Sequence, residues 1–187
     1  MITINSTKKL INKLPINADG TLPILNSSAA ANDADQQISN SNPLSNWHAN
    51  LLTIQRRNSI FLLHDQTRFP LFITCLVKKD FANLNHLFED ALLNTLLKLG
   101  ASQSQFEGAA RHIDNIRVGN DCKRSVQGTM NQMSQELAHI LWYDRVSISD
   151  ISPYRMAAHL ADRPCTVKGQ KDCIWPKAAM LTLLDNL

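Results

Sequence analysis

The chain has 187 residues and a formal net charge of +3, from 19 Lys and Arg against 16 Asp and Glu. This length suits a single domain over residues 1–187, and the small positive excess permits contact with nucleic acid without requiring it. The four cysteines show no paired spacing, no apolar stretch is long enough to cross a membrane, and the first residues lack a signal-peptide pattern. We therefore expect a cytoplasmic protein with reduced thiols and no membrane contact.

The first part of the chain predicts a short strand over 1–4 and two helical turns over 7–14, which end at Pro15. Residues 15–46 are rich in Asn, Ser, Ala, Asp and Gln, with only scattered Leu and Ile. So little apolar surface does not offset the entropy of ordering the chain. We expect a flexible insertion over 15–46, and its length leaves a functional lid as the alternative.

Three apolar runs follow, over 48–55, 59–64 and 68–74, and short polar breaks separate them. Such spacing is typical of an antiparallel three-stranded meander. The middle run is apolar on both faces at 60–63, which indicates an interior strand that is covered on two sides. Pro70 lacks a backbone N–H, so its strand is expected nearer an edge of the sheet.

The second half of the chain is mainly helical in pattern. Asp80 is a plausible N-cap for a helix whose apolar side chains repeat every 3.6 residues up to Gly100. A weaker helix is expected over 102–112 and a strand over 115–118; Asp121 is the expected cap of a long helix ending at Tyr143. Two shorter helices follow, over 153–161 and from Pro176. Together these elements predict an α+β fold, with a small, mainly antiparallel sheet covered by helices.

The octet Arg124-Ser-Val-Gln-Gly-Thr-Met-Asn131 begins the long helix of the second half. On a helical wheel the apolar stripe of this helix covers a narrow arc, and it consists of Val126, Met130, Met133, Leu137 and Ile140. Arg124, Gly128, Asn131 and Gln135 fall on the opposite side of the wheel. A glycine on a solvent-facing side costs a helix about 1 kcal/mol relative to alanine, so its presence calls for a cause.

Two interpretations of this polar helix face stay open. In the first, the Arg124 guanidinium forms a bidentate contact with a phosphate or carboxylate, and Asn131 orients the ligand with its amide. In the second, the face is a packing surface, and a loop lies across Gly128. The interpretations differ in what lies against the glycine.

These patterns resemble a family of bacterial proteins classed as a domain of unknown function. The resemblance rests on the segment Trp47-His-Ala-Asn-Leu-Leu52, which Arg56 and Arg57 follow, and on the octet. The opening at 7–10 adds to it, and Cys165 departs from a family pattern in which a Pro-Met pair usually stands. The resemblance implies a shared fold and draws attention to Trp47, Asn50 and Arg57 beside the octet. It implies no reaction.

Other candidate chemistry is sparse. His48 stands beside Trp47 and close in sequence to two arginines, so it is a candidate acid or base, or else an ordinary strand-edge histidine. Cys122 precedes the long helix, where a helix N-terminus and neighbouring cations lower a thiol pKa. The glycines form no phosphate-binding loop, and the His159, Cys165 and Cys173 spacing matches no zinc pattern. We expect no cofactor and no metal.

Three functional hypotheses follow. The first is a non-catalytic module that binds nucleic acid or a partner protein through the polar helix face and a basic hairpin. Its candidate binding residues are Trp47, Asn50, Arg56, Arg57, Arg124, Ser125, Gly128 and Asn131. Lysines at 8, 9, 13 and 123 would extend a phosphate-binding patch if the fold gathers them.

The second hypothesis is an enzyme that acts on a phosphate-containing substrate. In it, His48 is the acid or base, Arg57 and Arg124 hold the anion, and Asn131 orients it. It requires these side chains to converge on one pocket. The third hypothesis is that the octet is a structural signature only, which predicts a covered Gly128 and an internally paired Arg124.

Overall fold

The computed structural model describes residues 1–24, 42–167 and 172–187. Within these residues the strands are β1 (Ile2–Ser6), β2 (Trp47–Ile54), β3 (Arg57–His64), β4 (Pro70–Leu76) and β5 (Ile116–Gly119). The α-helices are α1 (Lys8–Ile11), α2 (Leu84–Leu99), α3 (Gln103–His112), α4 (Arg124–Tyr143), α5 (Pro153–Ala161) and α6 (Pro176–Asp185), and a 3₁₀ helix, η1 (Lys78–Asn83), precedes α2. The predicted α+β class is confirmed.

The strands form one sheet in the order β4-β3-β2-β1-β5. The two longer pairings, β2 with β3 and β3 with β4, are antiparallel and form the predicted meander. The first strand, β1, lies between β2 and β5 and is parallel to both. Pro70 begins β4 at the edge of the sheet, where its missing N–H costs no ladder hydrogen bond.

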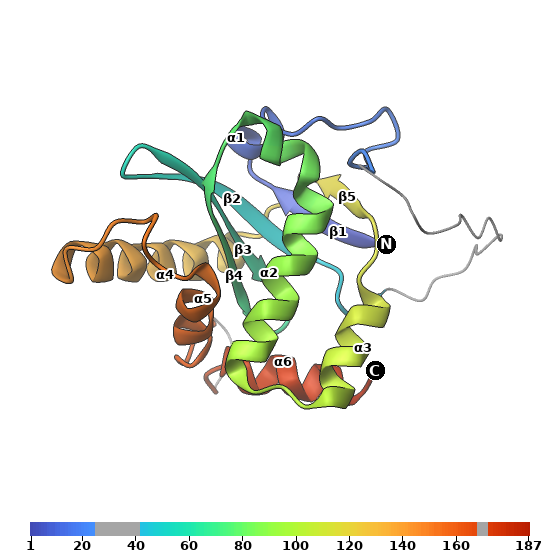
Figure 1. Cartoon of the computed structure of the whole chain (residues 1–187). Coiled ribbons are helices and arrows are strands. Elements are labelled where there is room, and N and C mark those ends of the chain that lie inside the picture. The colour runs from blue at the N-terminus through green and yellow to red at the C-terminus, as the bar shows by residue number, and fades with distance from the viewer. Residues whose placement is uncertain (25–41, 168–171) are drawn as a thin grey trace.

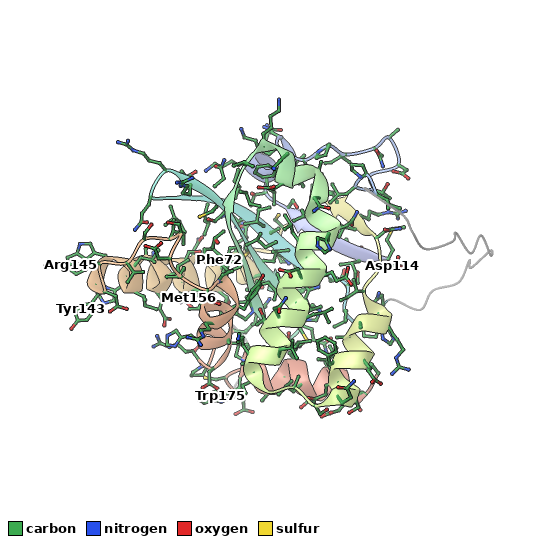
Figure 2. All side chains as sticks on the ribbon, viewed as in Figure 1. Phe72, Asp114, Tyr143, Arg145, Met156 and Trp175 are labelled. Carbon is green, nitrogen blue, oxygen red and sulfur yellow. The ribbon has the colours of Figure 1, made fainter. Side chains whose placement is uncertain are left out.

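Helices cover both faces of the sheet, so the molecule has two hydrophobic layers. In Figure 1, α2 crosses in front of the sheet and α4 lies behind it. The larger core lies on the α2 side, where Trp47, Ile60 and Leu62 meet Phe88. The second core lies under α4 and takes the alternate side chains of β3, Phe61 and Leu63, as period-two alternation requires. Phe72 and Met156, both labelled in Figure 2, also belong to this second layer.

The prediction that Asp80 is the N-cap of the α-helix is wrong, because a 3₁₀ helix precedes that α-helix. Asp80 lies inside η1, and its carboxylate accepts a hydrogen bond from the Val77 N–H at 2.7 Å. The α-helix proper begins at Leu84, and it ends at Gly100, which has a positive φ of 75°. The 3₁₀ turn therefore takes up the first part of the predicted helix.

The insertion expected over 15–46 falls largely outside the described residues, which omit 25–41. Both of its ends belong to the fold. Leu22 and Leu44 are buried in the larger core. Thr21 forms a bridge with Arg117 of β5, and Leu22 donates its N–H to the Ile116 carbonyl at 3.1 Å. The described parts of the expected insertion, 15–24 and 42–46, thus pack against the rest of the fold.

Candidate functional site

The polar face of α4 is exposed, as the helical wheel predicts. Arg124, Gly128, Asn131 and Gln135 all lie at the surface. The buried residues of α4 are Val126, Thr129, Met130, Met133, Leu137 and Leu141, and Ile140 of the predicted stripe is only half-buried. A Cβ atom built on Gly128 meets no described atom within 4 Å, so no described segment lies across the glycine.

Arg124 forms no ion pair or side-chain hydrogen bond with any described residue. Together with the open space at Gly128, this counts against the hypothesis that the octet is a structural signature only. A packing role predicts a neighbour for both residues. Both residues are instead exposed, without such a neighbour among the described residues.

The start of α4 lacks a side-chain cap. Lys123 is the N-cap and contributes no side-chain hydrogen bond, and no acidic residue lies in the first turn. The cap predicted at Asp121 is therefore wrong. The first backbone N–H groups of a helix have no intrahelical acceptor, and they carry the positive end of the helix dipole. Such an end is suited to an anion.

Polar side chains from two neighbouring segments gather at this helix start. The backbone N–H of Lys123 donates to Nε2 of His48 at 3.0 Å. The Lys123 ammonium pairs with the Asp65 carboxylate. Arg68 Nη1 lies 3.4 Å from the other Asp65 oxygen, and Arg68 Nη2 lies 3.5 Å from Ser125 Oγ. The Asp65 carboxylate thus pairs with two cations, Lys123 and Arg68, beside a helix start that has no side-chain cap.

Arg68 is the least expected member of this cluster. Its exposed fraction is only 5%, and its backbone has a positive φ of 57°, which is uncommon for a non-glycine residue. Its Nε atom is buried and has no hydrogen-bond partner among the described residues. Arginine is almost never fully buried without partners, because desolvating its charge is costly.

The cluster shifts the pKa values of two of its members. Burial lowers the pKa of His48, and the charges of Lys123 and Arg68 add to that effect against the opposing effect of Asp65. Burial by itself raises the pKa of Asp65, but the hydrogen bond and charge of Lys123, with the charges of His48 and Arg68, outweigh it and lower the net value. Near neutral pH, His48 is therefore uncharged and Asp65 is ionised.

A surface cavity of about 460 Å³ adjoins the first turns of α4. It lies where the parallel strands β1 and β5 end, the position at which open sheets commonly bind ligands. Its lining consists of Ser6, Thr7, Lys8, Ile11, Asn120, Cys122 and Gln127. Gln127 is one helical turn from Arg124, so the cavity continues the polar helix face.

The option of a reactive thiol at Cys122 is not supported by its surroundings. Burial raises the pKa of Cys122; a hydrogen bond from Gln127 opposes this and the nearby Asp121 charge reinforces it. The raised pKa leaves the thiol protonated at neutral pH. Cys122 thus contributes to the cavity wall as a neutral group.

The same surface reaches the β2–β3 hairpin. Gln55 and Arg56 occupy the two-residue turn with positive φ values of 47° and 65°, and Ile54 pairs with Arg57. From α1, Lys9 Nζ lies 3.5 Å from Thr53 Oγ1, near the end of β2. The fold thus links the basic residues of α1 to the hairpin on one side and to α4 on the other.

Trp47, a predicted binding residue, is fully buried on the α2 side. Its Nε1 donates to the Leu44 carbonyl at 2.6 Å, and its ring packs edge-on against Phe88 at 5.2 Å. It faces away from α4 and has no exposed surface for a ligand. Asn50 is half-buried, and its Oδ1 accepts a hydrogen bond from Thr7 Oγ1 at 3.0 Å. Both residues therefore hold the elements around the site in place.

The residue set of the enzyme hypothesis does not converge. His48 is opposite Leu63 in the sheet, and Arg57 lies six residues earlier on β3. At about 3.3 Å per residue, this separation is roughly 20 Å. His48 is adjacent to Lys123 but has an exposed fraction of only 1%. Its position suits holding the helix start more than proton transfer to a substrate.

Sequence reasoning missed Asp65 and Arg68, which lie in or beside a polar break between predicted strands. A break of this composition is typical of any solvent-exposed turn, so it carries no signal of burial. The far end of α4 is a different kind of surface, where Trp142 and Tyr143 are exposed by 75% and 72%. Figure 2 shows Tyr143 and Arg145 there, projecting away from the sheet.

Within the described residues, no three histidine, cysteine or acidic side chains lie close enough together to hold a metal ion. No helix in the same part of the chain has the length and apolar character needed to span a bilayer.

Comparison with known proteins identifies the family. No curated protein and no solved structure gives a significant match. The family model of a domain of unknown function, DUF6933, matches residues 3–179, which include every element described above except the first residue of β1 and the end of α6. The chain therefore belongs to the DUF6933 family.

Proposed function

We propose that this protein is a non-catalytic binding module that contacts the phosphate backbone of nucleic acid. The binding surface would run from the start of α4, across the cavity at the ends of β1 and β5, to the β2–β3 hairpin. We place this role in the cytoplasm, because the cysteines show neither a disulfide spacing nor a bridge between them.

The cavity that Lys8 and Gln127 line together carries this proposal. It joins the α1 lysines to the exposed face of α4, and the contact between Lys9 and Thr53 extends the same surface toward the hairpin. These two contacts support one continuous surface for three basic groups that are separate in sequence. A track of cations about 20 Å long matches the spacing of successive phosphates better than it matches a single small ligand.

The composition of the surface favours nucleic acid over a partner protein. Protein interfaces take most of their binding energy from buried aromatic and apolar anchors, and charged residues are depleted at their centres. The exposed aromatic side chains Trp142 and Tyr143 lie at the end of α4 away from Arg124, on a helix about 30 Å long at 1.5 Å per residue. The hairpin turn reaches that end, because Gln55 bonds to Val146 and Ile148, and exposed aromatic rings there can stack on bases. Exposed cations around Lys8 and Arg124 are the groups that displace counterions from nucleic acid.

The test is a salt titration of binding to labelled single-stranded and duplex oligonucleotides, measured by fluorescence anisotropy. Variants Arg124→Ala, Lys8→Ala with Lys9→Ala, and Arg56→Ala with Arg57→Ala should each weaken binding. Each lost phosphate contact should reduce the slope of log affinity against log salt by about one. The control is Lys98→Ala, which removes an exposed cation in the last turn of α2, on the other face of the sheet.

Two outcomes would contradict the proposal. One is wild-type protein that does not bind either oligonucleotide at low salt. The other is binding that Lys98→Ala weakens as much as Arg124→Ala does, because affinity would then follow net charge alone. Co-purification of a protein partner whose binding requires Arg124 would assign the same surface to protein recognition.

A further inference from the structure

The buried Arg68 has fewer partners than its guanidinium requires. Arginine carries five N–H donors, and its charge is costly to bury unless it is paired and hydrogen-bonded. Among the described residues its polar contacts are one Asp65 oxygen at 3.4 Å and Ser125 Oγ at 3.5 Å, both long. Its Nε has no partner. Nη2, the guanidinium atom nearest Ser125, has only the long contact with Ser125 Oγ, so an anion near Ser125 would give it a stronger acceptor.

Arg68 is directed at the first turn of α4. Nη2 approaches Ser125 Oγ, and Ser125 itself is exposed, so the buried guanidinium ends at the surface where the helix begins. No side-chain cap and no acidic residue occupies that turn. The backbone N–H groups of Arg124, Ser125 and Val126 belong to the first turn, where N–H groups lack intrahelical acceptors.

Charge at this point is favourable to an anion. Arg68 and Lys123 carry two positive charges, and Asp65 is the single carboxylate between them. Asp121 and Arg124, on the flanking exposed positions, offset each other. One positive charge and the helix dipole therefore remain, and both attract a tetrahedral anion with several acceptor oxygens.

We propose that the first turn of α4 binds one phosphate group, with Arg68 and the hydroxyl of Ser125 as direct donors and Lys123 at its edge. His48 is a positioning residue in this site, because its imidazole fixes the Lys123 backbone immediately before the helix. The proposal deepens the proposed function and rests on it for the source of the phosphate, which would be the nucleic-acid ligand.

The first measurement uses inorganic phosphate and ¹⁵N-labelled protein. Phosphate should shift the amide resonances of Ser125 and Val126, and sodium chloride at the same ionic strength should not. In a thermal melt, phosphate at about a hundred times its Kd should raise Tm by about 5 to 10 °C. The shifts and the rise in Tm that phosphate causes should be lost in Arg68→Met, which replaces the guanidinium with an apolar side chain of similar length. They should be reduced in Ser125→Ala.

Two further variants separate recognition from folding. Arg68→Lys retains the charge but loses the planar guanidinium, so it should retain only part of the rise in Tm that phosphate causes. Arg111→Ala removes an arginine from the last turn of α3 and should leave the effect unchanged. If Arg68→Met does not fold, Ser125→Ala decides, because Ser125 is exposed and its truncation leaves the core intact. Equal responses to phosphate and chloride would overturn the proposal.

The source of the phosphate is tested with one oligonucleotide carrying either a 5′-phosphate or a 5′-hydroxyl group. If both forms shift the Ser125 amide, a backbone phosphate occupies the site; if only the phosphorylated form does, the terminal phosphate occupies it. If inorganic phosphate shifts this amide and neither oligonucleotide binds, the phosphate site stands and the nucleic-acid function fails. If oligonucleotides bind wild type and Arg68→Met equally, without shifting Ser125, the site fails and the function stands.

Discussion

The imidazole of His48 and the backbone of Lys123 form the hydrogen bond that ties β2 to the start of α4. Nε2 of His48 accepts a hydrogen bond from the Lys123 N–H at 3.0 Å, and the histidine side chain is buried. Because Nε2 is the acceptor, the proton of the neutral ring is on Nδ1, which has no partner among the described residues. A strand residue thus determines where the helix begins.

We predict that His48→Leu lowers the free energy of unfolding by about 1 to 3 kcal/mol, because the Lys123 N–H loses its acceptor. His48→Gln should lose less than half as much, since its amide oxygen can take the place of Nε2. Urea denaturation measures both values. Hydrogen exchange at the Lys123 amide should accelerate in the leucine variant only; unchanged exchange in both would show that this bond does not hold the helix start.

We predict that Gly128→Ala raises the free energy of unfolding by about 1 kcal/mol. The new methyl group meets no described atom within 4 Å, and alanine loses less conformational freedom than glycine in a helix. If the exposed glycine allows a ligand to approach the α4 backbone closely, the same variant should bind oligonucleotides more weakly while being more stable.

The matched control is Gln132→Ala, an exposed position of α4 outside the polar face defined by Arg124, Gly128, Asn131 and Gln135. It should change neither stability nor binding by much. A destabilised Gly128→Ala protein would indicate a neighbour against the glycine, and would favour a packing role for the octet.

A third prediction concerns pH. Burial lowers the pKa of His64 from its ordinary 6.5 to about 4, against the raising effect of the Ser45 carbonyl and the Asp65 charge. The unfolded chain therefore takes up this proton at a higher pH than the folded protein does. The contribution of His64 to the free energy of unfolding should be fully present above pH 6.5. The free energy of unfolding should fall by about 3 kcal/mol as the pH drops to 4. The lowered pKa of His48 adds a loss in the same direction.

His64→Gln tests the assignment, because it removes the titrating ring. Nε2 of His64 donates to the Ser45 carbonyl at 3.0 Å, and Nδ1 bonds with Thr67 Oγ1 at 2.9 Å, so the neutral ring satisfies both partners. Between pH 4 and 6.5 the variant should show a smaller slope of unfolding free energy against pH. His139→Gln, at an exposed histidine of α4, should retain the full slope.

The regular elements could be predicted from the sequence because each has a strong local pattern. The meander has apolar runs separated by polar breaks, and the long helices repeat their apolar residues with the helical period, so β2, β3 and α4 lie close to their predicted ranges. The exposed face of α4 follows from the same period. The position of β1 between β2 and β5 could not be predicted, because pairing between distant strands leaves no local mark.

The candidate site could be predicted only in part, for the same reason. Arg124 and Gly128 are recognisable because a polar face and a helix glycine are local features. Arg68 became a site residue through its burial against α4, which is a tertiary property. Trp47 illustrates the reverse: the family resemblance suggested it as a contact residue, but alternation along β2 puts its side chain in the core.

The position of β1 also has a consequence for the order of folding. Ile2 pairs with Ile116 and Ile4 pairs with Trp47, so β1 acquires its two neighbours, β2 and β5, at very different times during synthesis. The meander of β2, β3 and β4 consists of local contacts and can form early. The sheet is complete only after β5 has been made, and closing so long a loop is entropically costly and slow. Until then the edge of β1 that β5 later covers offers unpaired backbone groups, and the incomplete sheet can pair there with a strand of another chain.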